Sequence, residues 1–185
     1  MKTVNLFADT ETLDNFKKYS NRVFLASAVG ANAIQHLDDA RMPKDFWVAV
    51  VFEFIYFYLA HAEARARAVG GDDHAERVSK RLSESLIHGA VDYVFDDVYK
   101  DDNQTLKLKH MEQLADRMDI YGKYEHAVPE KEGDISKGTA LWTFCRKVAA
   151  FVGHPEDTAY TMTCHAHIFD SLEVLDTETF LVFAH

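Results

Sequence analysis

The chain has 185 residues, a mass of 21.1 kDa and a formal net charge of −10 at pH 7. This length suits one domain with a sizeable core, and the composition of 48% hydrophobic residues with only 8 Gly and 3 Pro argues against disorder. Helix formers are plentiful and turn formers scarce, so we predict a single all-α domain over residues 1–185. The negative charge disfavours binding to DNA or RNA.

The first helix is predicted over about residues 10–37, and the second follows directly after Pro43. Residues 46–60 of the second helix are almost wholly apolar and include one lone carboxylate, Glu53. A segment of this length that is apolar on every side is typical of a helix surrounded by other helices. We therefore predict a central helix over about residues 43–69, with its end at Gly70–Gly71.

Four more helices are predicted from caps and apolar spacing, which makes a bundle of about six. They cover residues 72–98, 104–125, 134–153 and 155–175. Residues 127–137 are expected to form a surface loop. The tail at 178–185 is too apolar to remain in water, so it is expected to dock on the body of the protein or on a neighbouring subunit.

The two cysteines, Cys145 and Cys164, are isolated and lie in apolar helical segments, which favours free, buried thiols over a disulfide. The N-terminal apolar stretch is too short for a signal peptide, and residues 46–60 fall short of the roughly 20 that span a bilayer. The expectation is a soluble, cytoplasmic protein with no membrane span.

Glu53 shares a helical stripe with Ala49, Ala60 and Ala64, and a small-residue stripe at Ala26, Gly30 and Ala33 offers a match on the first helix. One interpretation is structural: Glu53 pairs with an Arg or a hydroxyl at that seam, or reaches solvent at its edge. The other is functional: the carboxylate has a raised pKa in an apolar pocket and binds a ligand.

Three further side chains, those of Tyr56, His61 and His165, are candidates for the same ligand site. Tyr56 is expected to bring its hydroxyl near Glu53 or His61, and His165 lies on the apolar face of the last helix. The alternatives are that His61 marks the point where the central helix leaves the core and that His165 is a core histidine.

A metal site is also considered on the last helix, where His167 is one turn from both Asp170 and Cys164. Such a site needs further ligands from another helix. The alternative is a surface histidine with an inert buried thiol. No spacing matches a recognised zinc or haem signature, so no cofactor is implied by motif.

Glu-x-x-His pairs, HExxH, GxSxG, GxGxxG and phosphate-binding glycine loops are all absent. We therefore predict a non-enzymatic binding or protein-interaction module that acts as a homodimer, because the helices carry much apolar surface and few catalytic constellations. One alternative is a small-molecule- or metal-binding enzyme with an inter-helix pocket that uses Glu53 and histidines. Another is an acidic partner or inhibitor of a basic protein.

Overall fold

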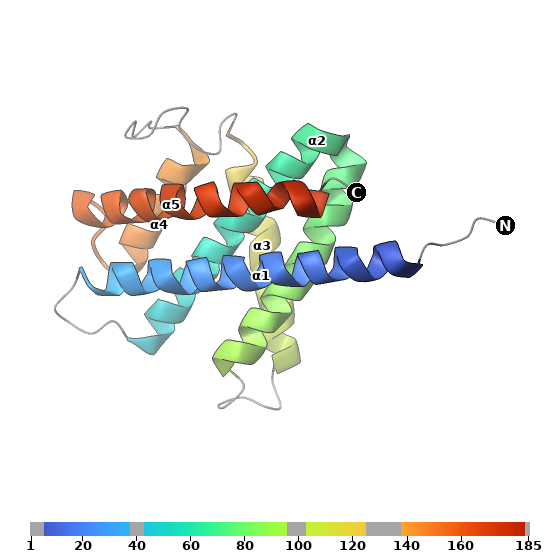
Figure 1. The fold of residues 1–185 in the computed structure, drawn as a ribbon. Helices are drawn as coiled ribbons and strands as arrows, with labels where there is room; N and C mark the ends of the chain where they lie inside the picture. The colour runs from blue at the N-terminus through green and yellow to red at the C-terminus, as the bar shows by residue number, and fades with distance from the viewer. Residues whose placement is uncertain (1–5, 38–42, 96–102, 125–137, 184–185) are drawn as a thin grey trace.

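The computed structural model describes residues 6–37, 43–95, 103–124 and 138–183, with the side chains of 6–14 and 177–183 excepted, and its fold is all-α (Figure 1). The described part of the chain contains no strand. It forms five helices: α1 (Leu6–Gln35), α2 (Lys44–Phe95), α3 (Asn103–Tyr121), α4 (Ala140–Phe151) and α5 (Thr158–Phe183).

The predicted central helix is confirmed as the first part of α2. Every residue from 50 to 59 is at most 2% exposed, and α1, α3, α4 and α5 all pack against α2. An 18-residue window of α2 is apolar enough to cross a membrane, and 72% of that window is buried within the fold. The hydrophobic effect acting on all sides of this segment explains why it lies at the centre.

α2 bends sharply at Gly71, where φ is 75° and ψ is −172°. Figure 1 shows the chain turning back at this point, so that α2 has a first limb (44–70) and a second limb (72–95). The predicted break was correct, because only glycine adopts this positive φ without strain. The structure has five helices where about six were predicted, because the two helices predicted on either side of this glycine are the two limbs of α2.

The later helices differ from the prediction mainly at their ends. α4 begins after Thr139, whose hydroxyl accepts a hydrogen bond from the Trp142 N–H at 3.1 Å. The predicted start of this helix near residue 134 and the predicted loop at 127–137 lie outside the described residues. α5 continues to Phe183, so residues 178–183 extend that helix and do not form a separate tail. Whether their side chains dock on the body lies outside the described part.

α1 and α5 run side by side in opposite directions across one face of the molecule (Figure 1). They pack tightly at Gly30, where an added Cβ atom would lie 2.6 Å from the His167 ring and 2.7 Å from Phe54. His167 donates from Nε2 to the Ala26 carbonyl oxygen at 2.7 Å. The small-residue stripe of α1 therefore receives a side chain of α5 together with Phe54 of α2.

Candidate functional site

Glu53 is the centre of a buried charged cluster between α2, α3 and α4. The side chain is 2% exposed, and its two oxygens accept hydrogen bonds from Nε of Arg117 at 2.9 and 3.0 Å. The Tyr121 hydroxyl donates to Glu53 Oε1 at 2.5 Å, and Nζ of Lys147 lies 3.7 Å from the same atom. Because a buried carboxylate is costly without partners, these donors offset the cost of burying Glu53.

The structural interpretation of Glu53 was right about the kinds of partner but wrong about the helix that supplies them. An Arg and a hydroxyl do bind the carboxylate, yet both come from α3, and the seam with α1 is filled by Phe54 and His167. The stripe of small residues on α2, which includes Ala60 and Ala64, faces α3. A residue one position from Glu53 faces α1 because consecutive helical side chains are about 100° apart.

The cluster has two cations for one carboxylate, with Arg117 18% exposed and Lys147 23% exposed. Burial raises the pKa of Tyr121, and the nearby Glu53 charge raises it further, so the phenol keeps its proton and acts as a donor. Burial lowers the pKa of Lys147 although Glu53 favours its charged form. The result is a polar cluster held in one geometry by both charge and hydrogen bonding.

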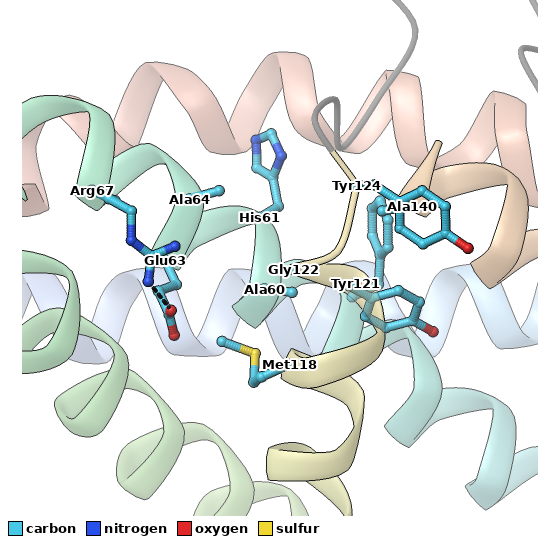
Figure 2. Close-up of a pocket in the computed structure, with 11 residues that line it drawn as sticks. Ala60, His61, Glu63, Ala64, Arg67, Met118, Tyr121, Gly122, Tyr124 and Ala140 are labelled. Carbon is cyan, nitrogen blue, oxygen red and sulfur yellow. Dashed lines mark hydrogen bonds and ion pairs between the residues drawn. The ribbon is translucent and has the colours of Figure 1, made fainter. Parts of the chain in front are cut away.

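A pocket of about 220 Å³ lies beside this cluster, between the first limb of α2, the end of α3 and the start of α4 (Figure 2). Ala60 and Ala64 leave the space open on α2, and Gly122 adds no side chain on the α3 side. Aromatic rings form much of the wall, and His61, Glu63 and Arg67 supply the polar edge. The remaining wall residues are Phe57, Met118, Tyr121, Tyr124 and Ala140.

His61 lines the pocket but is directed toward α5, as Figure 2 shows. Its Nε2 atom lies 3.2 Å from Oδ1 of Asp176; because a carboxylate oxygen can only accept, Nε2 carries the hydrogen. Nδ1 has no hydrogen-bond partner among the described residues. His61 is 7% exposed, and residues 63–65 and 67–70 that follow it are half-buried or exposed, in agreement with the prediction that it marks the helix's exit from the core.

Tyr56 belongs to a neighbouring network, one turn along α2 from Glu53 and also facing α3. Its hydroxyl lies 2.6 Å from Nδ1 of His110 and 3.1 Å from Oε1 of Gln113, both on α3. The His110 ring stacks on Phe52 with 3.6 Å between the centroids. Burial raises the pKa of Tyr56, and the Glu53 charge raises it further, so the two groups interact as expected, although the hydrogen bonds of Tyr56 go to α3.

Burial lowers the pKa of His110 from 6.5 to about 4. Between these values the unfolded chain binds a proton that the folded chain does not, so stability falls as the pH decreases from 6.5 toward 4. We expect this histidine to account for a loss of about 2 kcal/mol between pH 7 and pH 5. Urea unfolding at pH 7 and pH 5 should show that the free energy of unfolding changes less with pH in His110→Gln than in the wild type. The same change in both proteins would exclude this role.

The candidate residues of α5 lie in separate surroundings. His165 is buried and its ring packs on Phe169 at 4.7 Å, away from the pocket wall. Cys164 is fully buried, His167 donates to α1, and Asp170 is exposed. Cys145 and Cys164 are free and buried, as predicted. Within the described ranges, no group of three or more His, Cys, Asp or Glu side chains is arranged to hold a metal ion.

The sequence reasoning missed Arg117 and Lys147 as partners of Glu53. A usable signal was present for the first, because Arg117 and Tyr121 are one turn apart and therefore share a face of the helix predicted at 104–125. No comparable signal marks Lys147, which reaches Glu53 from a helix far along the chain. Comparisons with protein-family models, with characterised proteins and with solved structures find no match.

Proposed function

We propose that this protein binds a small ligand in the pocket between α2, α3 and α4. The observation that carries the proposal is the double role of Tyr121, whose ring forms part of the wall while its hydroxyl donates to Glu53. A wall held by a buried charged cluster is preorganised, which lowers the entropy lost on binding. Concave sites with apolar walls and a few convergent polar groups are the usual form of small-molecule sites.

The wall indicates a compact ligand with an apolar body and one polar end. Phe57, Tyr121 and Tyr124 offer ring surfaces, and the Tyr124 hydroxyl is already engaged by Thr143 at 2.6 Å. The polar edge is also partly engaged, since Arg67 binds Glu63 at 2.7 Å. Binding, and not catalysis, is the proposed activity, because no nucleophile lies with a base in the described wall.

Ala64→Leu is expected to fill the pocket and remove ligand binding. Ala64 is an exposed wall residue on α2, and leucine is a good helix former, so the fold should tolerate the change. Native mass spectrometry of untagged protein, followed by a thermal-shift screen of small polar aromatic compounds, identifies a ligand for the affinity measurement. The affinity of the variant should fall at least ~10-fold, as expected when the ligand's space is occupied.

Ala68→Leu is the matched control, since it makes the same change one turn further along α2 and outside the pocket wall. It should bind like the wild type. Equal binding by both variants would place the ligand elsewhere, and a screen without any binder would contradict the proposal.

The homodimer remains a proposal with a different basis from the one expected. The apolar surface of the central helix is buried within one chain and no longer supports it. Leu25 and Val29, one turn apart on α1, are 63% and 49% exposed and are the apolar residues that now favour self-association. The native mass spectrum reports the subunit number directly, and a monomer throughout the micromolar range would count against a dimer.

A further inference from the structure

A second concave site lies on the other side of the molecule, between α1 and the second limb of α2. It is a groove of about 230 Å³, lined on α1 by Lys17, Ser20 and Phe24 and on α2 by Gly89 and Tyr93. The rings of Phe24 and Tyr93 meet edge to face with 5.1 Å between centroids. Tyr93 is 75% exposed, so an aromatic surface is available at one end of the groove.

Two features show that the groove is not merely a gap between helices. Ser20 is 5% exposed, and its Oγ atom has no hydrogen-bond partner in the described part of the chain. Gly89 leaves the floor open, since a Cβ atom added there would meet nothing within 4 Å. An unpaired buried hydroxyl is uncommon in folded proteins, and a ligand oxygen is a natural partner for it.

The charge on the α1 side of the groove is opposite to that of the whole protein. Residues 15–24 of α1 contain three basic and no acidic side chains, and residues 85–93 of α2, which form the other wall, contain one acidic side chain and no Lys or Arg. Arg81 lies 5.8 Å over the Phe16 ring, which places it beside α1 one turn before the groove. On a chain with a net charge of −10, this local positive field favours an anion.

We propose that this groove binds a small aromatic anion, with the ring against Phe24 and Tyr93 and the negative group near Lys17 and Ser20. Lys17 supplies the charge, and the Ser20 hydroxyl donates a hydrogen bond to an oxygen of the anion. An aromatic ring packs well against the edge-to-face pair, and a carboxylate, sulfonate or phosphate is attracted by the basic side chains. The proposal does not depend on the pocket at Tyr121.

Anilinonaphthalene sulfonate is a suitable probe, because it is an aromatic anion that fluoresces when it leaves water. Saturable binding to the full chain is expected, with an affinity at least ~10-fold lower in Gly89→Leu, whose new side chain occupies the groove. Lys17→Gln should weaken binding by up to about 5-fold, as for one exposed charge pair. Lys18→Gln, the neighbouring change outside the groove wall, should have a smaller effect than Lys17→Gln, because Lys18 does not contact the ligand.

Two controls separate this groove from other sites. Uncharged phenylnaphthylamine should bind Lys17→Gln and the wild type equally, because it lacks the negative group. Ala64→Leu, which fills the pocket near Tyr121, should leave binding of the sulfonate unchanged. The proposal is overturned by equal affinity in Gly89→Leu and wild type, by loss of binding in Ala64→Leu alone, or by no saturable binding below about 1 mM.

Discussion

Arg117→Met should lower the free energy of unfolding by about 3–5 kcal/mol, because it leaves the Glu53 carboxylate buried without its principal counter-charge. Arg117 supplies both of its short hydrogen bonds to the 2%-exposed Glu53 side chain through Nε. Lys147, at 3.7 Å, is too distant to replace those bonds. Urea-induced unfolding followed by circular dichroism gives the measurement.

The double variant Glu53→Leu/Arg117→Met should regain most of that stability, because an apolar pair of similar volume needs no counter-charge. Arg146→Met is the matched control: Arg146 forms an exposed ion pair with Glu156 on the surface, so little change is expected. If the free energy of unfolding of Arg117→Met were within about 1 kcal/mol of the wild-type value, the burial of Glu53 would not depend on this partner.

Gly30→Ala should lower the free energy of unfolding by about 1–3 kcal/mol although alanine is the better helix former. The added Cβ would lie 2.6 Å from the His167 ring and 2.7 Å from Phe54, so both rings must move. His167 would then lose its 2.7 Å hydrogen bond to Ala26, and Phe54 would lose its edge-to-face contact with Phe144. Thermal and urea unfolding of the variant measure the effect.

Gly89→Ala makes the same chemical change on another helix at a position with open space around the new Cβ. It should raise the free energy of unfolding by about 0.5–1 kcal/mol through helix propensity alone. If Gly30→Ala and Gly89→Ala changed the free energy of unfolding equally, the result would contradict the close packing of α1 on α5.

The central helix and its end could be read directly from the chain. Residues 46–60 are apolar on every side, and burial from all directions follows from that pattern without knowledge of the neighbours. The break at Gly71 follows from a local rule, because a positive φ favours glycine. The helices predicted on either side of this glycine correspond to the two limbs of α2.

Glu53 shows the limit of the same reasoning. A lone carboxylate in an apolar segment requires a partner, so the sequence predicted an Arg or a hydroxyl beside it. Which helix supplies that partner depends on the packing order of the bundle, and helical periodicity defines a face without identifying its neighbour.

The amino-acid sequence by itself determined an all-α fold, its buried central helix and the need for a partner at Glu53, because these depend on local pattern and on solvation. Only the tertiary structure decided that Arg117, Tyr121 and Lys147 meet that carboxylate and that a pocket lies beside them. These contacts join positions about 64 to 94 residues apart, and their geometry arises from side-chain packing between helices.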